Sequence, residues 1–425
     1  MLVFIDLDGT LTNTIHPSWR PYRDGQAVIA PDQVPVFPGA REFISYCYQK
    51  GIHLVLVSDS HPRYVELLRQ YLGLQGICLA DKPNTARLND YIAISPILQQ
   101  ELRNPDGCFF VGDTKLDIEI GRKYGIRTIL LRQYWTKQED IDVVSGVGDD
   151  LGNLKMGATY EAKSFSEVIE ILQSPDDYLV ALEAQLIGKQ SNRAIIFKST
   201  TYSNGDWSGV FCLARQEEGC CDRFARSDCY RMIANPQRTN GFLDLMSGTM
   251  SSYIRFYQNA YTCQWDYLTY LSDKSTTVPP EKMKQIFDRV ESNIPKVKLL
   301  KWREMGQGSL RNQIDYSSRQ KFLADYLQID ETINLHGKNV IVFDDQLTTG
   351  ATAYYVIKSL KQRGAVNVLF IAFFQMILDV SDGMVCPRCG KPMRIKRKKK
   401  DGKRFYSCVP PEYGGDGCGN IINID

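Results

Sequence analysis

The sequence lacks any long hydrophobic run. Its 425 residues contain no stretch of about eighteen apolar residues, so we expect no membrane-spanning helix. A secretory leader is not expected either, because no basic residue precedes the first apolar run and Asp6 interrupts it. The 12 cysteines are too few for a disulfide scaffold in a chain of this length. These absences predict a protein of a reducing, cytoplasmic compartment that does not bind membranes.

Charge is nearly balanced over the whole chain but not along it. The 51 Lys and Arg residues and the 49 Asp and Glu residues give a net charge of +2. Residues 386–405 hold ten basic residues and one acidic residue, so the rest of the chain carries net negative charge. The length is too great for one ordinary domain. We therefore expect two or three domains, the last of them a basic appendage.

The most informative stretch lies near the N-terminus. Residues 2–5 are apolar and predict a short buried strand, and Asp6 and Asp8 follow it directly, before a Gly-Thr pair. Residues two apart in a strand point the same way, so the two carboxylates could share one site. Open α/β sheets bind ligands at the carboxyl ends of their strands. Two carboxylates that converge there would repel each other without a cation, and Mg²⁺, which prefers oxygen ligands, fits best.

Further polar residues accompany the later predicted strands. A second apolar strand is expected at residues 53–57 and another at 108–111, with helical stretches between them. Strands that alternate with helices in this way predict a parallel, doubly wound sheet. The polar residues at or between these strand ends are Ser58, Lys82, Asp113 and Asp117.

Residues 1–174 resemble the phosphohydrolases of the haloacid dehalogenase (HAD) superfamily. All four family motifs occur in order, namely Asp-Leu-Asp-Gly-Thr at 6–10, the strand-terminal Ser58, Lys82, and Gly-Asp-x-x-x-Asp at 112–117. The resemblance implies a Rossmann-like parallel sheet and hydrolysis of phosphomonoesters through an aspartyl-phosphate.

The same resemblance implies a role for each motif residue. Asp6 would be the nucleophile, and Asp8 would be the general acid and then the general base. Ser58 and Lys82 would hold the transferred phosphoryl group. The residues implied to hold Mg²⁺ are Asp6, Asp8 through its backbone carbonyl, Asp113, and Asp117 as a supporting or ligating carboxylate.

The places where HAD enzymes insert cap domains are short in this sequence. Residues 13–38 read as an irregular insertion, and the interval between Ser58 and Lys82 has room only for a helix and a turn. Within the family, an open site of this kind is usual for phosphatases that act on large substrates. Nucleic-acid ends, protein side chains and bulky nucleotides are all compatible with it.

A second combination of strand, acidic tip and small-residue loop occurs later in the chain. Residues 339–343 predict a buried strand that ends at Asp344 and Asp345, followed by a loop at 346–352 and a helix at 353–362. Adjacent carboxylates can accept hydrogen bonds from the vicinal hydroxyls of a ribose. The amides and hydroxyls of a Thr-Thr-Gly-Ala-Thr loop at a helix start can bind a phosphate. The pattern therefore predicts a ribose 5-phosphate site.

Residues 178–382 resemble type I phosphoribosyltransferases, especially those similar to the competence protein ComF, although only the loop is specific. The resemblance implies a second α/β domain that binds phosphoribosyl pyrophosphate (PRPP). The residues implied to bind PRPP are Asp344, Asp345, Thr348, Thr349, Gly350, Ala351 and Thr352. Two alternatives stay open, namely an ordinary strand-turn-helix unit and a site that binds nucleotide without transfer.

Four cysteines near the end of the chain have the spacing of a zinc site. They are Cys386, Cys389, Cys408 and Cys418. Four thiolates form a closed tetrahedral Zn²⁺ site, which is structural rather than catalytic. About 40 residues bury too little surface to fold alone, so the metal would supply folding energy. Between the cysteine pairs, a basic β-hairpin with Asp401-Gly402 at its turn is predicted.

This cysteine segment resembles the C4 zinc ribbon at the end of type IA topoisomerases. The resemblance implies binding of single-stranded nucleic acid. The basic side chains would contact phosphates, and Phe405 and Tyr406 could stack on bases. The alternative is a solvated hairpin or a ribbon that docks onto another protein.

The chain is thus interpreted as three modules: a HAD-like α/β domain at 1–174, a phosphoribosyltransferase-like α/β domain at 178–382 and a small β zinc ribbon at 384–425. The leading hypothesis is a bifunctional enzyme that pairs Mg²⁺-dependent phosphomonoester hydrolysis with PRPP-dependent transfer, on nucleotide, sugar-phosphate or nucleic-acid-derived substrates. One alternative is a phosphatase that processes nucleic-acid ends, whose transferase-like domain senses nucleotide or modifies a terminal ribose. A second is a regulatory binding protein.

Overall fold

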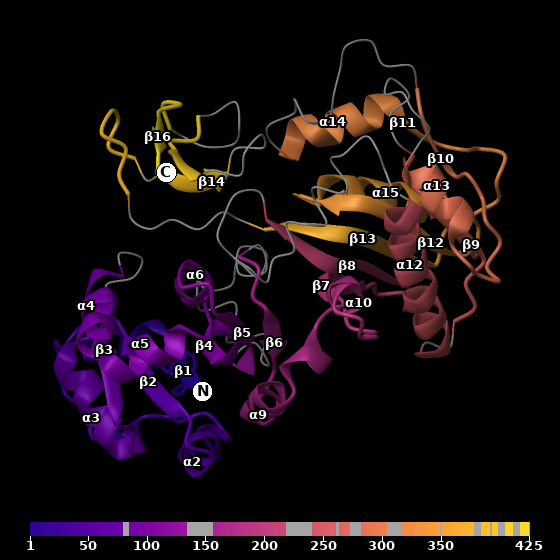
Figure 1. The fold of residues 1–425 in the computed structure, drawn as a ribbon. Helices are drawn as coiled ribbons and strands as arrows, with labels where there is room; N and C mark the ends of the chain where they lie inside the picture. Colours follow the sequence, from indigo (N-terminus) through magenta and orange to yellow (C-terminus); the bar gives the residue numbers. More distant parts are fainter. Residues whose placement is uncertain are drawn as a thin grey trace.

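The structure is a computed structural model. It describes residues 1–79, 85–133, 156–217, 240–260, 263–272, 282–303, 316–348, 350–377, 384–391, 393–397, 404–410 and 417–424. These residues form two large sheets with helices, a short two-stranded pair and a small C-terminal sheet (Figure 1). No helix within these ranges is both long enough and apolar enough to cross a membrane.

The first sheet has six strands, all parallel, in the order β3-β2-β1-β4-β5-β6. It confirms the predicted parallel α/β sheet. The strands are β1 (Leu2–Ile5), β2 (His53–Ser58), β3 (Gly76–Leu79), β4 (Cys108–Gly112), β5 (Arg127–Leu131) and β6 (Tyr160–Ala162). The helices of this part are α1 (Arg20–Arg23), α2 (Ala40–Gln49), α3 (Pro62–Leu72), α4 (Ala86–Ile94), α5 (Pro96–Leu102), α6 (Lys115–Lys123) and α9 (Phe165–Gln173).

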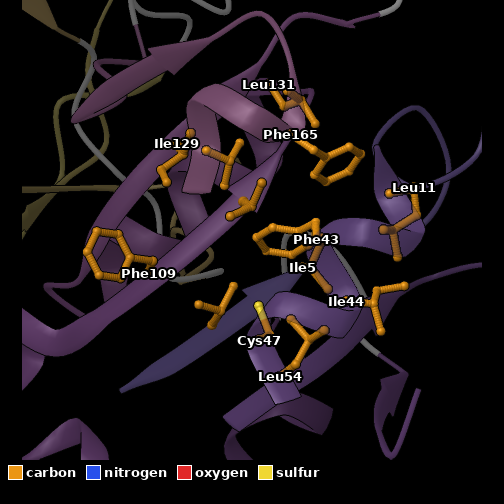
Figure 2. Packing of buried hydrophobic residues seen from close by; sticks show 14 of the residues in the cluster. Ile5, Leu11, Phe43, Ile44, Cys47, Leu54, Phe109, Ile129, Leu131 and Phe165 are labelled. Atoms are coloured by element: carbon orange, nitrogen blue, oxygen red, sulfur yellow. The ribbon is translucent and has the colours of Figure 1, made fainter. Parts of the chain in front are cut away.

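Side-chain alternation along β1 explains how the first sheet is buried on both faces. Val3 and Ile5 join one hydrophobic cluster, and Leu2 and Phe4 join another. The first cluster includes residues from α2 and α9, and Figure 2 shows Phe43 and Phe165 within it. Their ring centroids lie 5.1 Å apart. Burial on both faces is typical of parallel sheets and explains why these strands are almost continuously apolar.

A serine side chain caps the start of α9. The Ser164 hydroxyl accepts a hydrogen bond from the backbone N–H of Glu167 at 3.3 Å. This bond satisfies one of the amides that a helix start leaves without an internal partner.

The second sheet has five strands in the order β7-β8-β13-β12-β9. All neighbours are parallel except β7, which is antiparallel to β8. The strands are β7 (Ile195–Thr201), β8 (Trp207–Glu217), β9 (Tyr267–Tyr270), β12 (Asn339–Leu347) and β13 (Asn367–Ile377). The helices are α10 (Ala181–Leu186), α12 (Asn240–Ala260), α13 (Lys282–Arg289), α14 (Tyr316–Tyr326) and α15 (Ala351–Gln362), and β10 (Leu300–Trp302) pairs with β11 (Leu327–Ile329).

Two predicted boundaries in the second sheet were wrong. Strand β12 does not end at Phe343 but runs to Leu347, because β13 continues beside it and pairs with it at Asp344 and Leu347. Helix α15 starts at Ala351, two residues earlier than predicted. Strand pairing with a distant segment set the first boundary, and no local pattern shows such pairing.

The C-terminal sheet is small and antiparallel, in the order β14-β15-β16. Its strands are β14 (Arg394–Arg397), β15 (Arg404–Ser407) and β16 (Ile421–Asn423), drawn in yellow in Figure 1. The first two strands pair as the hairpin expected from the sequence, while Asp401-Gly402 at its turn lies outside the described residues. The module limits at 174, 178, 382 and 384 stay predictions.

Candidate functional site

The strand order of the first sheet locates its ligand-binding edge. Strands β1 and β4 are neighbours, and the chain leaves them toward β2 on one side and β5 on the other. In doubly wound sheets, ligands bind outside the carboxyl ends of the strands at this change of direction. Asp6 follows β1 directly and Asp113 follows β4 directly. The backbone N–H of Asp6 donates to the carbonyl of Val111 at 3.0 Å, which fixes the two strand ends side by side.

Three carboxylates converge at this edge. Asp6, Asp113 and Asp117 each place one carboxylate oxygen in a group whose atoms all lie within 4.8 Å of one another. Their exposed fractions are 6%, 0% and 0%. At such a separation, two carboxylates repel by about 3 kcal/mol or more at an effective dielectric constant of about 20. A divalent cation with oxygen ligands would remove this repulsion, so the donor set fits Mg²⁺.

Two glycines make room for these carboxylates. Gly9 has φ +88°, and a Cβ atom there would lie 2.2 Å from Asp113 Oδ2. A Cβ atom at Gly112 would lie 2.4 Å from Asp117 Cγ. The glycines of both motifs are therefore required by close approach, in addition to the backbone conformation at Gly9.

Hydrogen bonds orient two members of the carboxylate cluster. The Thr10 hydroxyl donates to Asp113 Oδ1 at 3.0 Å. Asp117 Oδ2 accepts from the backbone N–H and the hydroxyl of Thr114 at 3.1 and 2.7 Å. Asp117 therefore also fixes the first turn of α6, which agrees with either of the roles expected for it.

The Asp8 side chain is held apart from the carboxylate cluster. It accepts hydrogen bonds from the hydroxyls of Thr14 at 2.5 Å, Ser60 at 2.7 Å and Tyr64 at 2.9 Å. Burial, and next the charge of Asp8, raise the pKa of Tyr64 above its ordinary value, so the phenol stays a donor. The Asp8 carboxylate is not part of the group formed by Asp6, Asp113 and Asp117, and the metal role implied for its backbone carbonyl stays a prediction.

Sequence reasoning did not find the three hydroxyl residues around Asp8. Thr14 lies in the insertion, Ser60 follows β2 by two residues, and Tyr64 lies on α3. Each is an ordinary polar residue in its own segment. Only the packing of the insertion and α3 against the 6–10 turn brings them together. Of these three residues, only Ser60 could have been suspected from sequence, because it lies two positions after the motif residue Ser58.

Of the two residues predicted to hold a phosphoryl group, the structure describes only Ser58. Ser58 ends β2 and is buried, and its hydroxyl accepts from the backbone N–H of Ser60 at 3.2 Å. Lys82 lies outside the described residues. The predicted role of each residue stays a prediction.

The two carboxylates predicted to contact ribose differ in burial, since Asp344 is buried and Asp345 is partly exposed. Asp344 is buried within β12, and the Asp345 side chain forms an ion pair with Lys282, itself almost fully buried. The backbone N–H of Asp345 donates to Asp344 Oδ1 at 2.7 Å. Burial, and next the charge of Asp345, raise the pKa of Asp344. A cavity of about 1360 Å³ lined by described residues includes neither carboxylate.

The residues predicted to bind the 5-phosphate lie between the end of β12 and the first turn of α15. Thr348 is exposed, and its hydroxyl accepts from Arg319 at 2.8 Å. Gly350 has φ +78° and precedes α15, whose first two residues are Ala351 and Thr352. The remaining predicted residue, Thr349, lies outside the described residues. The loop therefore has an arginine beside a hydroxyl at a helix start, which is suited to an anion.

The four cysteines come together in one cluster. Their sulfur atoms all lie within 4.8 Å of one another, with Cys386 to Cys418 at 3.7 Å and Cys389 to Cys408 at 3.4 Å. A tetrahedral Zn²⁺ ion with Zn–S bonds of about 2.3 Å needs sulfur atoms about 3.8 Å apart. The backbone N–H of Arg388 donates to the Cys386 sulfur at 3.4 Å, as expected around a thiolate. The donor set and spacing fit Zn²⁺.

One protein-family model matches part of the chain. Its description is HAD-hyrolase-like, and it matches residues 81–153, which include β4, α6 and both carboxylates of the Gly-Asp-x-x-x-Asp motif. The match supports a HAD-like hydrolase domain in this chain. It covers less than half of the chain, and the second sheet and the cysteine cluster lie outside it. The comparison with curated proteins gave no match.

Several solved structures are similar to about two fifths of the chain. A hydrolase from Pseudomonas syringae is 15% identical, with 40% of this chain and 97% of that chain covered and a TM-score of 0.29. The D,D-heptose 1.7-bisphosphate phosphatase from B. bronchiseptica, complexed with magnesium and phosphate, is 16% identical, with 41% and 98% covered and a TM-score of 0.28. A HAD family hydrolase from Deinococcus radiodurans R1 with bound phosphate and sodium is 15% identical, with 42% and 96% covered and a TM-score of 0.29.

Proposed function

We propose that the first sheet carries a Mg²⁺-dependent phosphomonoesterase that works through an aspartyl-phosphate on Asp6. The observation that carries the proposal is the group of three buried carboxylates at the change of strand direction. Such a group is costly without a cation, and its position is where doubly wound sheets bind ligands. The family match to a HAD-like hydrolase supports the same class of chemistry.

Two carboxylates would perform the two chemical tasks of the reaction, nucleophilic attack and proton transfer. An Asp6 oxygen would attack phosphorus, and the bond between phosphorus and the leaving oxygen would break while Asp8 donates a proton to that oxygen. Asp8 would then take a proton from the water that hydrolyses the aspartyl-phosphate and releases inorganic phosphate. The hydroxyls of Thr14, Ser60 and Tyr64 hold Asp8 in one orientation. Mg²⁺ held by Asp6, Asp113 and Asp117 would neutralise the negative charge of nucleophile and phosphate.

Metal dependence and substrate size test this proposal. We expect phosphate release from p-nitrophenyl phosphate, nucleoside monophosphates and 5′-phosphorylated oligonucleotides to require added Mg²⁺. The activity should be lost on dialysis against EDTA, and Mg²⁺ should restore it while Zn²⁺ alone should not. Phosphate release that is independent of divalent ions would contradict the proposal. A preference for oligonucleotides over free nucleotides would favour the end-processing alternative.

Tyr64→Phe tests the positioning of Asp8. The change keeps the ring and removes one of three hydroxyl donors to the carboxylate. We expect kcat to fall by about tenfold with KM and the Mg²⁺ requirement little changed, because the hydroxyl acts through Asp8 and not on substrate. Steady-state kinetics measure this division. A change in KM alone would show that Tyr64 contacts substrate instead, and Tyr71→Phe on the same helix serves as the control.

We also propose that the 344–352 region binds the phosphoribosyl group of PRPP. The proposal is supported by the strand-loop-helix arrangement, by Gly350 at the helix start and by Arg319 beside Thr348. The Asp345–Lys282 ion pair implies that ribose hydroxyls would have to replace or share this contact. Binding without transfer is compatible with the same arrangement, and it would make the domain a sensor.

Asp345→Asn tests this second proposal. We expect PRPP binding, measured by calorimetry, and any pyrophosphate release across a panel of bases to be lost. The variant should also melt at a lower temperature, because the buried Lys282 ammonium would lose its carboxylate partner. Asp325→Asn on the exposed side of α14 is the matched control and should change neither. If Asp345→Asn lowers the melting temperature but binds PRPP like the natural chain, the ion pair is only structural.

For the C-terminal sheet we propose a zinc ribbon that binds single-stranded nucleic acid. The proposal is supported by the four converging thiols and by the basic strands β14 and β15. Tyr406 is only partly buried, so part of its ring is available to stack on a base. Docking onto another protein is the alternative.

A further inference from the structure

A large cavity lies between parts of the two sheets. Its volume is about 1360 Å³, and residues of β6 and α9 line one side while residues of β7 and α15 line the other. Arg215 of β8 holds the two sides together, because it donates to the carbonyl of Ala158 and forms a buried ion pair with Glu183. The volume exceeds the roughly 300 to 1,000 Å³ of ordinary small-molecule sites, so the cavity has room for a large ligand.

The wall of this cavity has more basic than acidic side chains. Seven Lys and Arg side chains line it against two Glu side chains, and two of the seven form ion pairs with acids outside the lining, Arg215 with Glu183 and Lys361 with Asp206. Glu161 is paired with Arg132 at 2.8 Å, and Glu167 accepts from the backbone N–H of Lys163 at 2.8 Å. In the described part of the chain, Lys198 and Lys358 have no carboxylate partner, and both are exposed. Unpaired cations along one hollow favour an anionic ligand.

Aromatic side chains lie among these cations. Tyr202 and Tyr354 line the cavity with exposed fractions of 39% and 47%, which is high for large apolar rings. Arg193 lies over the Tyr178 ring at 4.0 Å, so a guanidinium plane is also presented at the wall. Rings and guanidinium planes provide stacking surfaces for a nucleobase.

We propose that this cavity is a binding site for a phosphorylated nucleoside. The lysines would bind the phosphate, and the exposed rings would hold the base. The site is separate from the carboxylates Asp6 and Asp345, and of the proposed PRPP-binding residues that are described, Gly350 alone lines it. A ligand there would contact the first sheet through β6 and the start of α15 through Gly350, and so would link the two proposed active sites.

Calorimetry on the full chain tests the proposal. The Asp6→Asn background without added Mg²⁺ keeps the ligand intact whether or not the phosphatase proposal holds. We expect AMP to bind, with adenosine, ribose 5-phosphate and inorganic phosphate each at least about tenfold weaker. Raising the salt concentration should weaken AMP binding. The double variant Lys198→Glu/Lys358→Glu should lower the affinity by at least about tenfold.

Two further measurements place the ligand. Hydrogen exchange should show protection by AMP of residues 195–201 and 351–362. Lys50→Glu, an exposed change at the end of α2, should leave binding unaltered. If AMP binding is lost in Asp345→Asn but kept in the double variant, the nucleotide is at the 344–352 loop and the proposal is wrong. It is also wrong if AMP does not bind. A 5′-phosphorylated oligonucleotide that binds more tightly than AMP at the same residues would identify a strand end as the source of the nucleotide.

Discussion

Replacing Asp6 with asparagine is expected to abolish phosphomonoester hydrolysis without unfolding the protein. Loss of the nucleophile should lower kcat by at least about 10³-fold, because no other described carboxylate follows β1 directly into the site. Asparagine has nearly the same shape, so the hydrogen bond from the backbone N–H at position 6 to Val111 is preserved. Phosphate release at saturating substrate and Mg²⁺ measures the effect.

Asp6→Asn should not lower the melting temperature of the metal-free protein, which would distinguish loss of the nucleophile from loss of the fold. Three buried carboxylates whose oxygen atoms lie within 4.8 Å repel one another, so removal of one charge reduces this repulsion in the metal-free protein. We expect the variant to melt at or above the temperature of the natural chain without Mg²⁺. Its increase in melting temperature on addition of Mg²⁺ should be smaller, because one ligand is lost.

Asp32→Asn is the matched control for this experiment. Asp32 is an exposed acidic residue of the insertion, outside the carboxylate cluster, and its substitution removes the same charge. Both activity and the response to Mg²⁺ should stay unchanged. If Asp6→Asn keeps more than about a tenth of the activity, Asp6 is not the nucleophile, and the aspartyl-phosphate mechanism is wrong.

The carboxylate cluster could be predicted from sequence because its geometry is local to strand ends. Asp6 and Asp113 each follow a buried strand by one residue, and Asp117 lies one helical turn further along. Once the strands are parallel neighbours, these positions must meet at one edge. The cysteine cluster was predictable for a related reason, since four thiols of this spacing gain most when one ion binds them all.

The partners of the two acidic motifs could not be predicted in the same way. Tyr64 reaches Asp8 across 56 positions of the sequence, and Lys282 reaches Asp345 across 63. No sequence spacing predicts either pair, because each pair forms only after distant segments of the chain have packed together. The burial of Asp344 was missed for the same reason, since it depends on the extension of β13 beside β12. Strand ends are encoded locally, whereas the surroundings of a carboxylate depend on tertiary packing.

Removal of one thiol of the cysteine cluster should unfold the C-terminal sheet and leave the first sheet intact. Cys408 is fully buried, and its sulfur lies 3.4 Å from that of Cys389. The hydrophobic cluster around these cysteines is small, so metal binding, at about 10 to 16 kcal/mol in zinc-finger peptides, would supply most of the folding energy. We expect Cys408→Ser to lose its bound zinc and to become cleavable by protease between residues 384 and 424.

Three measurements on Cys408→Ser separate the functions of the chain. Zinc content by atomic absorption should fall by one equivalent per chain, whereas Cys263→Ser, outside the cluster, should keep it. Binding of a fluorescent single-stranded oligonucleotide, followed by anisotropy, should weaken by at least about tenfold, because the basic strands would no longer be held together. Phosphatase activity on p-nitrophenyl phosphate should stay the same, since the carboxylate cluster belongs to a different sheet. Unchanged zinc content would show that the thiols do not form a metal site. Loss of zinc with full oligonucleotide binding would instead leave the metal site in place and assign nucleic-acid binding to another surface, which would favour the protein-docking alternative for the ribbon.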